Sequence, residues 1–395
     1  MTRGPAPSTA LPAGVVDLLQ AAVGDGVCPG AALGLVWADG RRLATWSGRQ
    51  SSHRRVGHDL VLEPGPLVQG TTQWDLASLT KPMVVVTLLC RELASAQPRL
   101  RLDSTLGELL LDARHGPLAD VTVQALLGHA SGALAWADWF AATAHLADDA
   151  PVRAAALRAA VLATPTERSP GLAAVYSDVG YMSLGWALEA VCGAPLDALF
   201  ERGIRRPLRL ADAGYRRIST APAMPEAGIC ATEIWPPRCL DGLPLHGEVH
   251  DDNCAGLDGV AGHAGLFASL GDVLDWAAVW LQATAPDVAE PVFLDPGTAR
   301  LLVGRSAAPD TTWRLGWDTP SKVGSSAGSL APPGAFGHLG FTGTSVWLDP
   351  DAGLGVVLLT QRVHPSRDPH GPIKALRPRI HVALWAWLGQ SPTRD

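Results

Sequence analysis

The order of apolar and polar residues along the chain predicts strands near both ends and helices between them. Apolar residues recur at helical spacing in residues 11–23, and two β-rich runs follow at 30–37 and 42–46. Asp39 and Gly40 separate these two runs, and an Asp-Gly pair between apolar runs is a strong hairpin signal. Towards the C-terminus, strand patterns return at 313–317, 337–348 and 353–360, followed by a helical pattern at 380–388.

The middle of the chain carries the spacing of several helices. Apolar residues recur every three or four positions over residues 81–94, 122–127, 152–163, 181–192 and 271–281. The last of these follows Ser269, with Asp272 three residues on, which is similar to a capping box. Strands from both ends with helices between them predict an α/β (α+β) sandwich. We expect one antiparallel sheet of about five strands, flanked by terminal helices, with an inserted, mostly helical lobe.

The length of the chain favours two structural parts. A single hydrophobic core usually stops growing near about 250–300 residues, and this chain has 395. We therefore expect residues 1–80 and 301–395 to form the sheet domain and residues 81–300 to form the helical domain. The active site is expected in the cleft between them.

Composition and charge narrow the classes of partner. The chain is 47% hydrophobic and 17% charged, which is typical of a globular protein. A net charge of -7 without a long basic run argues against nucleic acid or anionic lipid, so we expect a small-molecule partner. No run is long enough to span a membrane and no signal-peptide pattern is visible, so we expect a cytoplasmic protein. The six cysteines form no CxxC pair, and we expect free thiols.

The first candidate for chemistry is the segment 75–82, with the sequence Asp-Leu-Ala-Ser-Leu-Thr-Lys-Pro. It places Ser78 three residues before Lys81 at the expected start of a helix, and residues three apart on a helix share a face. A hydroxyl nucleophile needs a neighbour that takes its proton or favours its ionisation, and an amine or ammonium one turn away can do either. A helix cap beside a solvated lysine would give the same pattern.

Two further segments carry candidate residues. Tyr176 is followed by Ser177 and Asp178 just before a helical pattern. A phenol serves as a general base if a neighbouring cation such as Lys81 favours its ionised form, although a packed tyrosine at a capped helix start is the alternative. Residues 337–344 read Gly-His-Leu-Gly-Phe-Thr-Gly-Thr. A glycine-rich strand beside the nucleophile can aim a backbone N–H at a developing oxyanion, whereas a bulged strand with a buried histidine is the alternative.

The order and spacing of the three segments resemble the serine β-lactamases and penicillin-binding proteins, closest to the class C and esterase branch. The resemblance covers nearly the whole chain and includes 29–31, 126–132, 247–253, 262–267 and 358–365. These last segments resemble a subgroup that contains esterases and peptidoglycan-fragment amidases. The resemblance implies that Ser78 is the nucleophile, Lys81 its activating partner and Tyr176 the general base, with the backbone N–H groups of Ser78 and Phe341 as the oxyanion hole.

The chain departs from the family pattern at three positions. Asp178 stands where the family usually has Asn, His338 where it usually has Lys, and Leu339 where Thr or Ser is common. These changes remove contacts that would hold a substrate carboxylate, which argues against strong penicillin hydrolysis. A protonated His338 would bind an anionic group and give pH dependence near its titration range. Asp178, His338 and Gly340 are the expected substrate-binding residues, and by the resemblance Trp136 and Trp139 wall the acyl or leaving-group pocket.

Other signals compete with this interpretation. Residues 324–328 match the G-x-S-x-G nucleophile elbow, but their flanks indicate a loop rather than the strand and helix that the motif requires. His246, His250 and Cys254 recur every four residues, so zinc binding is an alternative to a loop braced by hydrogen bonds. His129 and His263 are expected in structural turns.

We therefore expect a serine hydrolase that cleaves a small ester or amide through a Ser78 acyl-enzyme and needs no metal or organic cofactor. A carboxylesterase-like activity is preferred over an amidase or peptidase acting on peptidoglycan fragments or D-amino-acid peptides, and over a β-lactamase. A catalytically weak binding protein with the same fold is the alternative from another class.

Overall fold

A computed structural model describes residues 10–220, 228–235, 238–239, 242–287, 293–368 and 370–390. Its centre is one antiparallel sheet with the strand order β2-β1-β10-β9-β8. The strands are β1 (Gly30–Trp37), β2 (Arg42–Gly48), β8 (Phe336–Leu339), β9 (Ser345–Asp349) and β10 (Leu354–Thr360). Strands from both ends of the chain therefore form one five-stranded sheet, which confirms the fold class that the sequence predicts.

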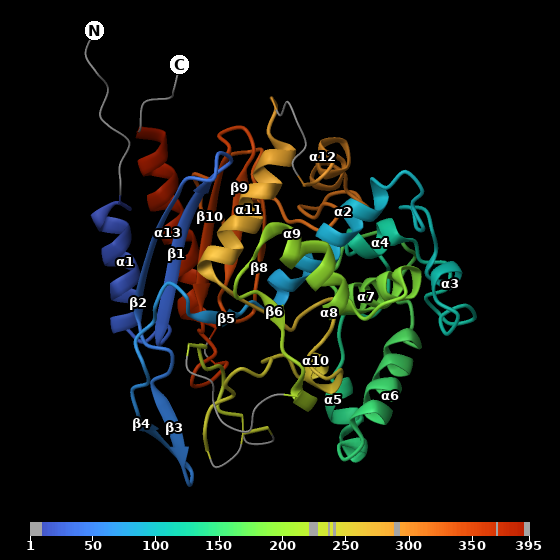
Figure 1. Cartoon of the computed structure of the whole chain (residues 1–395), viewed down its shortest axis with the longest axis horizontal. Coiled ribbons are helices and arrows are strands. Elements are labelled where there is room, and N and C mark those ends of the chain that lie inside the picture. The colour runs from blue at the N-terminus through green and yellow to red at the C-terminus, as the bar shows by residue number, and fades with distance from the viewer. Residues whose placement is uncertain are drawn as a thin grey trace.

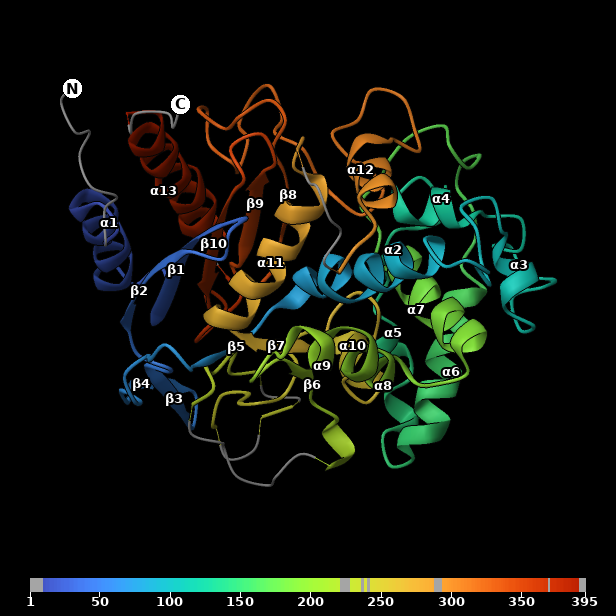
Figure 2. The ribbon, with the colours of Figure 1, turned by 45° about the horizontal axis from the view of Figure 1, so that its top comes forward.

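Helices cover both faces of this sheet (Figures 1 and 2). Helices α1 (Ala13–Gly24) and α13 (Gly371–Gln390) lie on one face, and α11 (Leu270–Thr284) lies on the other. Alternate residues of β1 point to opposite faces of the sheet. Leu33 and Leu35 pack in the core with α1 and α13, whereas Ala32 and Val36 pack in the core that contains α11. At Gly34, an added Cβ would lie 2.8 Å from Leu274 of α11, so a glycine lets the helix approach the strand closely.

The remaining elements lie between β2 and β8 in the sequence and pack mostly beside the sheet (Figure 1). Three short strands form a small sheet with the order β5-β7-β6, and a separate hairpin joins β3 to β4. These strands are β3 (His53–Val56), β4 (Asp59–Leu62), β5 (Gln73–Asp75), β6 (Gly214–Tyr215) and β7 (Leu266–Ser269). The helices are α2 (Thr87–Leu93), α3 (Leu106–Leu109), α4 (Val123–Leu127), α5 (Trp139–Ala142), α6 (Ala150–Leu162), α7 (Asp178–Cys192), α8 (Leu196–Phe200), α9 (Arg206–Leu208), α10 (Asp252–Gly256) and α12 (Pro296–Gly304).

Helix α11 comes from the segment 81–300 but packs on the sheet. It begins where the sequence indicated, because the Ser269 hydroxyl accepts a hydrogen bond from the backbone N–H of Asp272 at 3.3 Å. The division of the chain into domains at residues 80 and 300 stays a prediction.

Two predicted elements differ from the structure. Residues 313–317 form no strand, and Asp318 alone makes an isolated bridge, to Gly337. Gly316 has a φ of +98° and lies against Val86, while the Trp317 ring stacks on Trp276 in the core. Tertiary packing therefore overrides the local strand pattern. The pattern at 337–348 is two strands rather than one, because the chain turns between β8 and β9.

Two findings concern the cysteines and the membrane. All six cysteines are unpaired, as the sequence predicts. Over the ranges that the structure describes, no helix combines the length and apolar content needed to cross a bilayer.

Candidate active site

Ser78 lies at a sharp turn between β5 and the helix that follows. The residue before it, Ala77, has a φ of +47°, which is uncommon for any residue except glycine. The buried carboxylate of Asp75 supports this turn, since it accepts hydrogen bonds from the backbone N–H groups of Ala77 at 2.8 Å and His250 at 2.7 Å. Ser78 lies on the wall of a cavity of about 520 Å³. The turn therefore presents the hydroxyl where a substrate can reach it.

Lys81 is fully buried and joins the candidate catalytic residues. Its Nζ donates to Ser78 Oγ at 2.9 Å, to Tyr176 Oη at 2.6 Å and to Asp178 Oδ1 at 2.7 Å. The carbonyl oxygen of His263 lies 3.3 Å away. Ser78, Lys81 and Tyr176 therefore meet at one point, as the sequence predicts, and Asp178 meets them there.

The charge on Lys81 is set by Asp178. Burial by itself would lower the pKa of Lys81, but the Asp178 carboxylate and then Tyr176 outweigh burial, and the pKa is raised. Burial raises the pKa of Tyr176. The Lys81 ammonium by itself would lower this pKa, but burial has the larger effect and the pKa stays raised. The resting site therefore holds an ammonium at Lys81 and a neutral phenol at Tyr176. This corrects the expectation that Lys81 makes the phenol ionise.

The start of α7 positions Tyr176 and Asp178. Ser177 caps this helix, because its hydroxyl accepts from the backbone N–H of Gly180 at 3.2 Å. The backbone N–H of Ser177 donates to His129 Nδ1 at 3.1 Å. The His129 ring lies 4.7 Å from the Tyr176 ring, and the Trp313 ring lies 5.2 Å from it. These contacts hold the phenol against Lys81, although 37% of Tyr176 is exposed.

The end of β8 is tied to the chain that leads to Ser78. The hydroxyl of Thr342 donates to the Asp75 carbonyl at 2.8 Å, and that of Thr344 donates to the Leu76 carbonyl at 3.1 Å. Gly340 must be small, because an added Cβ would lie 2.6 Å from the Leu76 carbonyl oxygen. Among the described residues, the backbone N–H groups of Ser78 and Phe341 have no acceptor. Both residues line the cavity, so these N–H groups can serve a substrate carbonyl.

His338 does not behave as the sequence suggested. It lines the cavity but is buried, and its Nδ1 lies 2.8 Å from the carbonyl oxygen of Leu339. Burial, together with the nearby Lys81 charge, lowers the pKa of His338 to about 3. The imidazole is therefore neutral at neutral pH, which corrects the expectation that it titrates there and binds an anion.

The two tryptophans expected at the pocket lie in different places. Trp136 lines the cavity and is 54% exposed. Trp139, the first residue of α5, is only 7% exposed and belongs to the core. The structure therefore brings Trp136 to the cavity but not Trp139. Trp313, which the sequence placed in a strand, lines the cavity instead.

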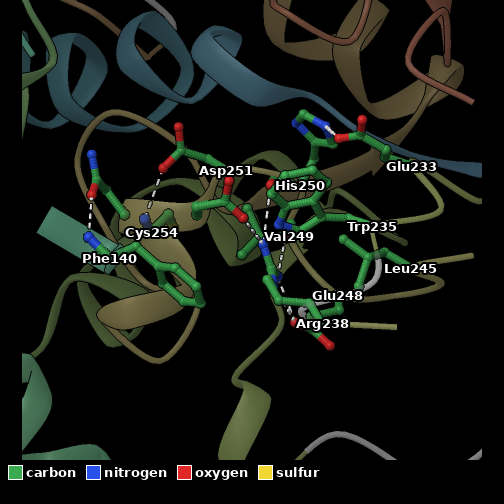
Figure 3. Close-up of polar contacts among 12 residues, drawn as sticks. Phe140, Glu233, Trp235, Arg238, Leu245, Glu248, Val249, His250, Asp251 and Cys254 are labelled. Atoms are coloured by element: carbon green, nitrogen blue, oxygen red, sulfur yellow. Dashed lines mark hydrogen bonds and ion pairs between the residues drawn. The ribbon is translucent and has the colours of Figure 1, made fainter. Parts of the chain in front are cut away.

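A partly buried network of charged residues includes the segment 248–254 (Figure 3). His250 Nε2 lies 3.0 Å from Glu233 Oε2, and Arg367 donates to the same carboxylate at 2.5 Å. Arg238 donates to Glu248 at 2.5 Å and to Asp252 at 2.9 Å. Hydrogen bonds of this network hold the loop at the cavity wall. This agrees with a loop braced by hydrogen bonds, which the sequence offered as the alternative to zinc binding.

The histidines and the cysteine of the alternative metal site point to separate partners. His246 Nε2 lies 2.6 Å from the Ile229 carbonyl oxygen, and Cys254 Sγ donates to the Ala264 carbonyl at 3.3 Å. His263 Nε2 lies 2.9 Å from Asp251. Within the described ranges no three such side chains converge as metal ligands do.

Several residues of the cavity wall belong to no motif that the sequence displays. One group lies on the chain after β10 and on α13, and it carries most of the positive charge of the cavity. Its members are Arg362, Arg367, His370, Lys374 and Arg377. No short motif marks these residues, because they are brought together only when the C-terminal helix packs beside the sheet.

Comparison with known proteins identifies the family. The family model described as Beta-lactamase matches residues 15–377. The chain belongs to the Beta-lactamase family. This is a serine hydrolase family of the β-lactamase and penicillin-binding-protein type, as the three sequence segments indicate.

Curated relatives of this family member are named as a carboxypeptidase and an amidase. A putative D-alanyl-D-alanine carboxypeptidase of Escherichia coli is 32% identical over 241 residues, which cover 57% of this chain and 54% of that protein. An N-acetylmuramyl-L-alanine amidase of Bacillus subtilis is 35% identical over 221 residues, covering 52% and 48%. The chain thus spans about half the length of the curated relatives it matches.

Solved structures share the β-lactamase fold over nearly the whole chain. Simvastatin synthase from Aspergillus terreus has a TM-score of 0.68 at 20% identity, covering 96% of this chain and all of that one. A hydrolase with promiscuous acyltransferase activity has a TM-score of 0.65 at 20% identity, covering 94% and 97%. An octameric penicillin-binding protein homologue from Pyrococcus abyssi has a TM-score of 0.66 at 18% identity, covering 96% and 78%.

Proposed function

We propose that this protein is a serine hydrolase that cleaves a small ester or amide through an acyl-enzyme on Ser78. The observation that carries the proposal is the position of Lys81 Nζ, 2.9 Å from Ser78 Oγ and 2.6 Å from Tyr176 Oη. A nucleophile, a proton-transfer group and a cation within hydrogen-bond reach form the arrangement that covalent catalysis requires.

In the proposed acylation, Ser78 Oγ attacks the carbonyl carbon and the C–O bond forms. The hydroxyl proton passes to the Tyr176 oxygen while the phenol gives its own proton to the leaving group, whose bond to the carbonyl carbon breaks. Because one proton enters the phenol as another leaves, Tyr176 stays neutral, in agreement with its raised pKa. The Lys81 ammonium stabilises the charge that develops on both oxygens, and the Ser78 and Phe341 N–H groups receive the oxyanion.

Deacylation reverses the roles of the same groups. A water molecule attacks the acyl carbon and gives a proton to the Tyr176 oxygen, and the phenol proton returns to Ser78 Oγ as the ester bond breaks. The carboxylic acid leaves and the resting site is restored. The reaction needs no group outside the chain except water.

Two substrate classes fit this mechanism. Carboxylesterase-like activity follows from His338 and Leu339, which replace the lysine and hydroxyl that would hold a penicillin carboxylate. Amide cleavage in peptidoglycan fragments is supported by the names of the curated relatives, an amidase and a putative D-alanyl-D-alanine carboxypeptidase. We place the protein in the cytoplasm as part of this proposal, and the six unpaired cysteines support that location.

The test compares the native chain with Ser78→Ala on a panel of p-nitrophenyl esters and on an N-acetylmuramyl-L-alanine peptide. Ser326→Ala is the matched control, because Ser326 lies in a loop in the segment that matches the G-x-S-x-G motif. We expect a fluorophosphonate adduct on Ser78, and loss of both the adduct and hydrolysis in Ser78→Ala but not in Ser326→Ala. A folded native chain that neither labels nor hydrolyses any substrate contradicts the proposal and favours a binding protein.

A further inference from the structure

The part of the cavity beyond Phe341 has an unusual surplus of positive charge. We call this part the basic arm and define it by Arg362, Lys374 and Arg377, which all line the cavity. None of the three forms an ion pair with a carboxylate of the described residues. Buried or cavity-facing cations are usually paired, so this arrangement calls for an explanation.

Arg362 is a buried member of the basic arm, and it faces the aromatic ring of Phe341. Its guanidinium lies 4.2 Å from the ring centroid, and its Nε donates to the Phe341 carbonyl at 2.8 Å. It is only 5% exposed, and another of its nitrogens, Nη1, donates to the Arg367 carbonyl. Its Nη2 donates to no described residue. The carboxylates of Asp368 and Glu233 act on its charge without forming an ion pair with it; Asp368 is exposed to solvent, and Glu233 is paired with Arg367.

Arg377 fixes the turn that carries the oxyanion residue. Its guanidinium is buried and donates to the carbonyl oxygens of Gly340 at 2.6 Å, Thr344 at 2.9 Å and Gly343 at 3.2 Å. These acceptors are neutral carbonyls, so the guanidinium is hydrogen-bonded but its positive charge is not neutralised. Burial, followed by the neighbouring Arg362 charge, lowers the pKa of Arg377 to about 10. The residue therefore stays charged at neutral pH.

Lys374 completes the basic arm from the first turn of α13. It is exposed and lines the cavity. The first turn of a helix adds partial positive charge from its free backbone N–H groups. The exposed ammonium of Lys374 and the enclosed guanidinium of Arg362 both line the cavity and supply donors that an anion can accept.

The other charges of the cavity wall are already paired. Asp178 pairs with Lys81 at 2.7 Å and Asp251 with His263 at 2.9 Å. Asp252 lies between Arg238 and Arg367, and Arg367 is also held by Glu233. Asp318 is the remaining acid of the wall; burial raises its pKa, and it lies beside β8 rather than in the basic arm. The surplus charge is thus confined to the basic arm.

We propose that the basic arm binds a carboxylate of the substrate, so that the preferred substrates are esters or amides that carry a carboxylate a few bonds from the cleaved carbonyl. This inference rests on the proposed function, because it takes Phe341 as the residue that receives the carbonyl oxygen. Arg362 stacks on Phe341 and Arg377 supports the preceding Gly340, so an anion there lies next to the bound carbonyl. The position differs from that of His338, which is neutral and lies on the strand before the turn.

The test uses matched esters that differ only in charge. p-Nitrophenyl valerate is compared with mono-p-nitrophenyl glutarate, which has a carboxylate at the end of the acyl chain. Phenyl acetate is compared with 4-acetoxybenzoate, which has a carboxylate on the leaving group. We expect the native chain to favour the charged member of at least one pair by about tenfold or more in kcat/KM, as for a hydrogen bond between charged groups.

The variants decide which residues cause the preference. Lys374→Ala and Arg362→Gln are each expected to reduce the charged-to-neutral ratio of kcat/KM several-fold, chiefly through KM. Lys322→Ala, which removes an exposed lysine from a loop outside the cavity, is expected to leave the ratio unchanged. Equal rates for both members of both pairs, or a preference that survives in Lys374→Ala and Arg362→Gln, would overturn the inference while leaving the proposed function intact.

Failure of the proposed function is recognised separately. If no ester is hydrolysed in a Ser78-dependent way, glutarate binding is measured by calorimetry in the native chain, Lys374→Ala and Lys322→Ala. Binding that weakens only in Lys374→Ala supports the basic arm without the catalytic proposal. Absence of glutarate binding in all three proteins rejects the basic arm as well.

Discussion

On the Ser78 side of the cavity, Lys81 and Asp178 neutralise each other at 2.7 Å, whereas beyond Phe341 three cations have no described carboxylate partner. The first arrangement fixes protonation states before a substrate arrives, because each charge is held by its neighbour. The second leaves charge that a substrate can neutralise. Paired charges in this cavity therefore suit proton transfer, and unpaired charges suit recognition of a substrate. Four variants test this difference between the two sides.

Lys81→Ala should have the largest effect, because it removes the ion pair between Lys81 and Asp178. We expect kcat/KM to fall by about 10³-fold, the scale of a lost proton-transfer partner. The free energy of unfolding should fall by about 3 kcal/mol, because Asp178 loses its buried partner. Steady-state kinetics and urea denaturation measure the two effects, with Lys322→Ala as the control. Activity within tenfold of the native chain would remove Lys81 from the mechanism.

Glu233→Gln should come next, because Glu233 anchors His250 and Arg367 behind the cavity. Burial by itself would raise the pKa of Glu233, but the bonds from His250 and Arg367 outweigh burial and lower the pKa to about 2. A lowered pKa stabilises the fold above the unfolded value of about 4.3, and this contribution disappears as the pH falls towards about 2. We expect a loss of about 3 kcal/mol at pH 7.

The pH dependence separates this effect from a general packing defect. The difference between Glu233→Gln and the native chain should shrink as the pH falls below about 4.3, as measured by denaturant unfolding at several pH values. Glu63→Gln is the matched control, since Glu63 pairs with Arg54 at the exposed surface and should change stability little. A deficit of Glu233→Gln that stays constant with pH would show that its charge does not matter.

Asp178→Asn should have a moderate effect that changes the pH profile. Asp178 is the main group that opposes the effect of burial on the pKa of Lys81. Without its charge, burial lowers the pKa of Lys81, and the ammonium is lost at a lower pH. We expect kcat to fall by about tenfold, and the alkaline limb of the pH profile to move to lower pH. An alkaline limb that does not move would mean that Asp178 does not control the charge of Lys81.

His338→Asn should have the smallest effect on pH dependence. The pKa of His338 is lowered to about 3 by burial, so the imidazole stays neutral between about pH 5 and 8, where histidines usually titrate. We expect the shape of the kcat/KM profile over this range to match that of the native chain. Loss of an acidic limb near neutral pH in the variant would instead assign anion binding to His338 and weaken the case for the basic arm.

Features that depend on near neighbours in the chain can be predicted from the sequence. Ser78 and Lys81 are three residues apart, a spacing that places them on one side of the chain, and Lys81 Nζ donates to Ser78 Oγ at 2.9 Å. The Asp39-Gly40 pair joins β1 and β2 in an antiparallel hairpin. The order of the three sequence segments was enough to identify the family, which the family model confirms over residues 15–377.

Tertiary packing determines which charges meet and which side chains reach the cavity. Asp178 lies 97 residues from Lys81, and no sequence pattern indicates that their charges pair. Trp139 entered the core and Trp313 entered the cavity wall, against their local patterns. Burial and charge pairing act through space, so they set pKa values only once distant segments are packed together. The neutral His338, the charged Lys81 and the unpaired basic arm are therefore properties of the fold, although each residue is visible in the sequence.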